Sequence, residues 1–206
     1  ENENIKKLQE RETTVIFGIE NKEKVDENEI IEQMDVTQGK IVIGMDLTLE
    51  NTTQKYATIV YNAILGGTAN SKMFQEVREK ASLAYSAGST YLRYKGNILI
   101  KCGIEIKNYE KTLEIIRKQL EDMKNGIFTD EDIQNAKKSI ISGIKSIEDE
   151  QDTEITYFFG QELTNEKTLT DEYIKNIEKV SKEDIIKIAK SLQINTIYFL
   201  KDKEEA

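Results

Sequence analysis

Two polar side chains that could act on a peptide bond, Arg78 and Tyr85, stand seven positions apart. A guanidinium is permanently charged and offers a planar fork of donors that suits carbonyl or carboxylate oxygens. A phenol is a neutral donor whose hydrogen bond strengthens as a carbonyl oxygen becomes an oxyanion. Together the two side chains would suit recognition of a peptide bond and stabilisation of the charge that develops on its carbonyl oxygen. Neither side chain can activate water at neutral pH.

The side chains that activate water or hold a transition metal are missing from this sequence. It contains no histidine and one cysteine, Cys102, among 206 residues. A serine–histidine triad, a histidine general base and a zinc site with histidine or several cysteine ligands are thereby excluded. Glu76 and Glu79 make a poor zinc site without histidine, so we interpret them as surface charges. We expect no metal or cofactor in this chain and interpret Cys102 as a small buried strand residue.

The composition indicates an acidic globular chain. Hydrophobic residues make up 38%, and 29 basic against 38 acidic residues leave a net charge of −9. Without a clustered basic surface, nucleic acid and anionic lipid are disfavoured as partners. No apolar run approaches the roughly 20 residues that span a bilayer, and no leader opens the chain, so we expect a cytoplasmic location. Because the first residue is Glu1 rather than methionine, we expect a piece of a longer protein.

Three small residues are predicted to shape the helices around the arginine. Gly66 and Gly67 follow a helical pattern over residues 54–65, and we expect them to end that helix in a left-handed conformation. They would also allow a close approach of another backbone. Ser71, or Asn70 beside it, is expected to cap the next helix, which carries the arginine. The three are assigned structural roles.

The remaining pattern predicts strands at both ends of the sequence and a run of helices between them. Strands are expected over residues 39–49, 84–94, 97–105 and 194–200, the middle two as a hairpin around Gly96. Helices are expected over residues 109–125, 130–148, 153–163, 171–180 and 182–192. We predict an α+β fold, with a mainly antiparallel sheet and helices packed on one face.

The first 35 residues differ from the rest in composition. They are polar and charge-dense, with one apolar patch at residues 13–17 that has the β-branched character of a short strand. We predict that residues 1–35 form a linker or N-terminal extension with that short strand. Residues 36–206 would then form a single domain.

The stretch from Leu65 to Ser86, LGGTANSKMFQEVREKASLAYS, is the most informative in the sequence. Its double glycine, its helix ending in Val-Arg-Glu-Lys and its Ser-Leu-Ala-Tyr strand entry resemble the signature of the second domain of pitrilysin-type metallopeptidases. Insulysin and mitochondrial processing peptidase belong to this family. Residues 34–40 also look like the entry to this domain in a bacterial branch. The resemblance covers about residues 30–200, and its motifs are specific only before residue 108.

The resemblance implies a division of labour between two domains. In this family a first domain carries the zinc motif His-x-x-Glu-His, whose glutamate is the general base. The second domain holds no zinc and lends an arginine–tyrosine pair to the active site across an inter-domain chamber. Arg78 and Tyr85 match that pair, so the resemblance implies that both bind substrate and assist catalysis. Some bacterial members pair a zinc-bearing subunit with an inactive one, and this chain looks most like the inactive partner. The implied partners are a zinc-bearing domain or subunit, which would hold the zinc, and extended peptide, with dimer formation left open.

Two other functions stay open. A purely structural subunit of the same fold, as in respiratory-complex core proteins, would need neither Arg78 nor Tyr85. Those residues would then be an exposed helix residue and a half-buried strand aromatic. A free-standing binding module would need a ligand that the sequence does not name, since Gly66-Gly67 lacks the lysine and spacing of a P-loop. Co-purification with a zinc peptidase would favour the peptidase function.

Overall fold

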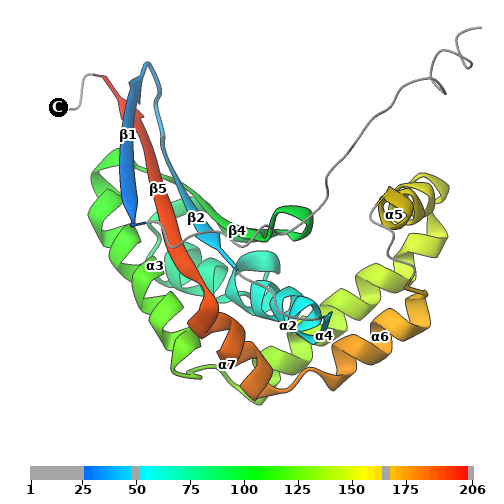
Figure 1. Ribbon diagram of the computed structural model, residues 1–206. Helices are drawn as coiled ribbons and strands as arrows, with labels where there is room; N and C mark the ends of the chain where they lie inside the picture. Colours follow the sequence, from blue (N-terminus) through cyan, green and yellow to red (C-terminus); the bar gives the residue numbers. More distant parts are fainter. Residues whose placement is uncertain (1–25, 48–51, 164–167, 204–206) are drawn as a thin grey trace, which may run out of the picture.

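The computed structural model describes residues 26–47, 52–163 and 168–203 (Figure 1). The strands are β1 (Asn28–Met34), β2 (Gly39–Asp46), β3 (Ala84–Leu92), β4 (Asn97–Ile104) and β5 (Gln193–Asp202). The helices are α2 (Thr52–Asn62), α3 (Tyr109–Lys124), α4 (Asp130–Lys145), α5 (Gln151–Leu163), α6 (Thr170–Lys179) and α7 (Lys182–Ser191). Two π-helical segments, η1 (Ala63–Gly67) and η2 (Phe74–Lys80), lie between α2 and β3.

The five strands form one sheet in the order β1-β5-β2-β4-β3. Only the β1–β5 pair is parallel, and the other pairs are antiparallel. Burial alternates along β2, where Ile41, Ile43 and Met45 are buried while Lys40 is exposed. The buried side chains face α2, α3 and α7, which cover one side of the sheet (Figure 1). The predicted α+β fold, with its mainly antiparallel sheet and helices on one face, is confirmed.

The hairpin and the helices were predicted correctly in order and to within a few residues. Gly96 has a left-handed φ of 62° at the turn between β3 and β4. On β4, Ile98, Ile100 and Cys102 are buried on one face, as the alternation indicated. Thr129 and Ser181 each close a capping box at the start of α4 and α7. These local signals succeed because a cap or a turn is completed within a few residues.

The linker predicted for residues 1–35 is wrong where the structure describes it. Asn28–Met34 forms β1, which pairs with β5, although every residue of the strand is exposed. The strand escapes a composition-based prediction because backbone hydrogen bonds, not burial, hold it at the edge of the sheet. Its carboxylates Glu29 and Glu32 also accept hydrogen bonds from the Tyr109 and Tyr198 hydroxyls. The strand expected at residues 13–17 lies outside the described residues, and the domain boundary near residue 35 stays a prediction.

No helix in the described parts of the chain is both long and apolar enough to cross a membrane.

The capping box at the start of α7 predicts a pH-dependent contribution to stability. Asp184 accepts hydrogen bonds from the Ser181 hydroxyl at 2.6 Å and its N–H at 3.0 Å, and these bonds lower the pKa of the carboxyl. Its contribution is therefore present above the ordinary aspartate pKa of about 3.9 and is lost as the pH falls through the lower folded value. We expect Asp184→Asn to destabilise the domain by roughly 0.5–1 kcal/mol at pH 7.

Chemical denaturation of both proteins between pH 3 and pH 7 measures this effect. The difference in the free energy of unfolding should shrink as the solution is made more acidic. Glu114→Gln, which replaces an exposed carboxylate on α3, serves as the matched control. A pH-independent difference would contradict the role assigned to the Asp184 carboxylate.

Candidate functional site

The helix ends at the two adjacent glycines as predicted, but not in the predicted conformation. Gly66 and Gly67 belong to η1, which continues α2 through a wider π-helical turn. Among the glycines of the described residues, positive φ angles occur at Gly96 and Gly126, so the expected left-handed ending is wrong. The segment ends at Gly67, and Thr68 follows it with an extended backbone and a hydroxyl that donates to the Ala63 carbonyl at 3.2 Å.

The glycines allow η1 to lie directly on strand β3. A Cβ atom on Gly66 would stand 2.4 Å from the backbone nitrogen of Ser89, and one on Gly88 would stand 3.0 Å from the Gly66 carbonyl oxygen. The Ser89 hydroxyl donates to Asn62 Oδ1 at 2.8 Å beside this contact. A Cβ on Gly67 would meet the Asn62 side chain at 2.8 Å. Backbone therefore packs on backbone here, and the contact fixes the helical segment against the sheet.

Ser71 starts the next helix with its backbone but not with its side chain. Its carbonyl accepts the Gln75 N–H at 2.9 Å, and its own N–H donates to Thr68 at 3.1 Å. The side chain is only 1% exposed, and its hydroxyl has no hydrogen-bond partner. The predicted side-chain cap is therefore wrong. The preceding turn buries this small residue, so its hydroxyl does not reach the first free N–H groups of the helix.

Arg78 lies near the end of η2, with 45% of its side chain exposed. Its guanidinium carbon stands 4.7 Å from the centre of the Phe74 ring, one turn earlier, which supports it by a cation–π contact. Its Nε atom is 3.8 Å from Glu79 Oε1, an exposed pair of little energetic weight. The guanidinium is thus held loosely at the surface.

Tyr85 occupies a β-bulge near the start of β3. Ala84 pairs with Ile104 and Ser86 with Gly103, so Tyr85 is an extra residue in the strand. In a regular strand, Tyr85 would oppose Ile104 and face the helices, in alternation with Ala87, which opposes the buried Cys102. The bulge gives that place to Ala84, and Tyr85 is 57% exposed.

A tight turn joins the two elements that carry this pair. The Leu83 N–H donates to the Val77 carbonyl at 3.1 Å, and Ser82 between them has a positive φ of 51°. Val77 and Leu83 are both buried, so they anchor η2 and β3 to the core on either side of the turn. Arg78 follows the first anchor directly, and Tyr85 follows the second by two residues. The two side chains are exposed on adjoining elements and do not hydrogen-bond to each other.

The other residues considered for chemistry have structural surroundings. Glu76 pairs with Lys80 at 2.6 Å, as expected of a surface charge. Cys102 is buried, and burial raises the pKa of its thiol to about 12. Within the described ranges, histidine, cysteine, aspartate and glutamate side chains form no group of three or more that could hold a metal ion.

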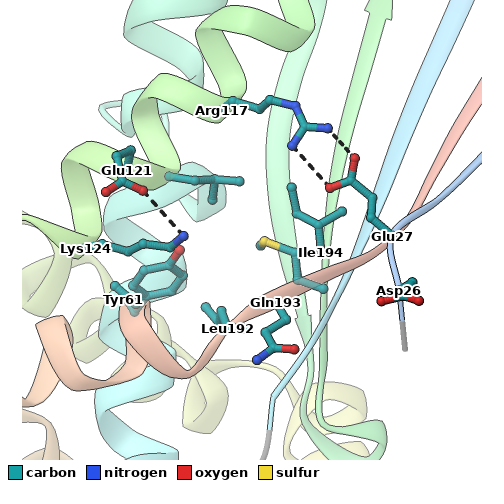
Figure 2. A pocket seen from close by; sticks show the side chains of 12 residues that line it. Asp26, Glu27, Tyr61, Arg117, Glu121, Lys124, Leu192, Gln193 and Ile194 are labelled. Atoms are coloured by element: carbon teal, nitrogen blue, oxygen red, sulfur yellow. Dashed lines mark hydrogen bonds and ion pairs between the residues drawn. The ribbon is translucent and has the colours of Figure 1, made fainter. Parts of the chain in front are cut away.

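The structure also contains a cavity of about 400 Å³ that the sequence did not indicate (Figure 2). Residues of α2, α3, α7, β2 and β5 line it, together with Asp26 and Glu27 ahead of β1. Each contributes one or a few side chains, so no contiguous motif marks the cavity. Only the apolar faces of the helices were visible in the sequence, and those same faces also build the core.

Comparison with known proteins assigns this fold to a family of peptidase domains. The sequence model of the family described as the peptidase M16 inactive domain matches residues 3–140 of this chain. The chain therefore belongs to this family. The resemblance to the zinc-free domain of pitrilysin-type enzymes is thereby confirmed.

Individual relatives agree with this assignment. The chain is 38% identical over 201 residues to the probable inactive metalloprotease YmfF of Bacillus subtilis, covering 97% of this chain and 47% of YmfF. It is 29% identical to YmxG of the same organism, described as an uncharacterized zinc protease, over 66% of this chain and 34% of YmxG. The chain thus spans about half the length of YmfF and about a third of the length of YmxG.

Solved structures share the fold. A conserved protein from Enterococcus faecalis superposes with a TM-score of 0.79 at 27% identity, covering 94% of this chain and 46% of that protein. A peptidase M16 inactive domain from Pseudomonas fluorescens gives a TM-score of 0.70 at 15% identity, covering 87% of this chain and 44% of that chain.

The contact between η1 and β3 predicts that alanine destabilises the domain at Gly66 but not at Gly143. In Gly66→Ala the new methyl group would collide with strand backbone, which has no flexible end to move aside, and we expect a loss of about 2–4 kcal/mol in unfolding free energy. Gly143 in α4 is the matched control, because a Cβ there meets nothing within 4 Å. Gly143→Ala should stabilise the domain by about 0.5–1 kcal/mol. Equal effects in urea denaturation would contradict the close contact.

The buried Ser71 hydroxyl predicts that its removal is harmless. Loss of a side-chain cap typically costs about 1 kcal/mol. Here no hydrogen bond is lost, and an unsatisfied buried group is removed, so Ser71→Ala should leave stability unchanged or raise it slightly. Thr129→Ala, which removes a formed capping box at the start of α4, should show the full loss in the same denaturation series. A similar loss of stability in Ser71→Ala would show that the Ser71 hydroxyl does cap the helix.

Proposed function

We propose that this domain is the non-catalytic half of a zinc metallopeptidase and supplies Arg78 and Tyr85 to a zinc site on another domain or subunit. The observation that carries the proposal is the β-bulge of β3, which exposes the phenol on the element adjoining the arginine's helix. An arrangement that served packing alone would gain from burying an aromatic ring of this size. The bulge does the opposite.

Both side chains keep their donors available for a substrate. Within the described residues, the Tyr85 hydroxyl makes no hydrogen bond, and Arg78 has only its distant contact with Glu79 and its support from Phe74. A carbonyl oxygen that approaches this surface can therefore accept from the phenol as its negative charge develops. The guanidinium can bind a neighbouring carbonyl or carboxylate of the same peptide.

The strand that carries Tyr85 suits an extended peptide. Among the strands that the structure describes, β3 is an edge strand that pairs only with β4, so its outer backbone groups are not used in pairing with any of them. An extended peptide laid along this edge can bond to those groups and bring its carbonyls past the phenol. The substrate in this proposal is peptide backbone, not a particular side chain.

Zinc and the activated water must come from the partner. The sequence has no histidine, and the inactive domain family to which it belongs fits a non-catalytic role. The description of YmxG as a zinc protease supports a partner half that holds the metal. That partner is either the rest of a longer chain or a separate subunit, and the same two residues would serve in both cases.

Reconstitution of this chain with its zinc-bearing half tests the proposal. Tyr85→Phe should lower kcat on fluorogenic peptides on the order of 10²-fold, because it removes one oxyanion donor. Association of the two halves should be unchanged. Arg78→Lys keeps the charge but loses the fork of donors, so it should raise KM more than it lowers kcat.

Tyr198→Phe is the matched control, since it removes a hydroxyl from β5 that bonds to Glu32 rather than to substrate. Its turnover should equal that of the wild type. Unchanged turnover in Tyr85→Phe would remove the catalytic role. If the two wild-type halves form a normal complex that shows no peptidase activity, a structural subunit is favoured instead.

A further inference from the structure

The cavity beside α3 has an apolar floor and a charged mouth (Figure 2). The floor consists of Met45, Leu120, Ala189 and Leu192 together with the ring of Tyr61, all less than 9% exposed. It lies on the helix-covered side of the sheet, because Met45 belongs to the buried face of β2. A volume of about 400 Å³ falls in the range of about 300–1,000 Å³ typical of small-molecule sites.

Four of the five charged side chains at the mouth are paired with one another, and the fifth, Asp26, is exposed to solvent. The Arg117 guanidinium binds both oxygens of Glu27, and Lys124 Nζ stands 3.5 Å from Glu121 Oε2. Figure 2 shows both pairs at the edge of the cavity. A charged ligand would have to compete with these pairs and would also be placed on an apolar floor, which is costly without a buried counter-charge. The mouth therefore favours an uncharged ligand.

Tyr61 supplies a polar group inside the apolar floor. Its side chain is 1% exposed and lines the cavity, and Figure 2 shows its hydroxyl end on the side of Lys124. None of the described residues forms a hydrogen bond with this hydroxyl. Burial raises the pKa of the phenol, so the group stays a neutral donor throughout the physiological range. Unlike the enclosed Ser71 hydroxyl, this hydroxyl is accessible from the open side of the cavity, so a ligand oxygen there can accept its hydrogen bond in place of water.

We propose that this cavity binds a small uncharged molecule, of the size of one substituted aromatic ring, that carries a single oxygen acceptor for the Tyr61 hydroxyl. The apolar floor contacts the ring, and the phenol fixes its orientation. Apolar cavities of this kind readily take up ring-shaped molecules. The site shares no residue with the Arg78–Tyr85 surface, and it does not depend on the function proposed above.

A matched pair of probes isolates the predicted hydrogen bond. Acetophenone and cumene have nearly the same shape, but only acetophenone carries a carbonyl oxygen. Each is titrated into the ¹⁵N-labelled 206-residue chain, and the amide shifts of Leu120, Ala189 and Gln193 are followed. Both probes should shift these amides. Tyr61→Phe should weaken acetophenone about fivefold and leave cumene unchanged or tighter, because it removes one hydrogen bond and no apolar surface.

Two tryptophan variants separate the cavity from the rest of the surface. Ile194→Trp fills the cavity and should abolish the binding of both probes. Ile155→Trp, at a position of α5 that is 58% exposed, should change neither. The proposal is overturned if neither probe shifts the lining amides up to its solubility limit. It is also overturned if Tyr61→Phe affects both probes equally. The different effects of Tyr61→Phe on acetophenone and on cumene test the hydrogen bond by themselves, so the test remains valid even if Ile194→Trp does not fold.

Discussion

The backbone contact between Gly66 and strand β3 is the constraint on which the rest of the surface depends. Peptide groups can approach this closely only where no Cβ atom stands between them, and a Cβ on Gly66 would lie 2.4 Å from the Ser89 nitrogen. The contact holds η1 on the outer strand of the sheet. Because η1, the turn before Ser71 and η2 follow one another directly, the same contact fixes where Arg78 stands relative to the strand that carries Tyr85.

The β-bulge in β3 completes this arrangement. Regular alternation would direct the Tyr85 ring toward the helices, and one extra residue is enough to bring it out to the surface. The glycine contact positions η1, which precedes η2, and the bulge lies at the start of β3, which follows η2, so the two features act on either side of the segment that carries Arg78. Together they expose an arginine and a phenol on adjoining elements while the anchors Val77 and Leu83 remain in the core.

Two hydroxyl groups that form no hydrogen bond within the described residues differ in their surroundings. The Ser71 hydroxyl is enclosed, so it represents only a small local cost of the turn that places η2. The Tyr61 side chain lines a cavity with room for a ligand. Only in the second case can a ligand accept the hydrogen bond.

The sequence by itself determined the α+β class, the order of the helices, the hairpin and the candidate pair. Each of these depends on alternation, on caps such as Thr129 with Asp132, or on residues no more than a few positions apart. Only the tertiary structure decided that Asn28–Met34 is a strand, that β3 is the element which Gly66 approaches, and that the Tyr61 cavity exists. Those features are settled by partners far along the chain: Glu29 bonds to Tyr109, and Glu32 to Tyr198. Hydrogen bonds and packing across such separations leave no periodic trace in the local sequence, because either partner alone is compatible with a solvent-exposed position.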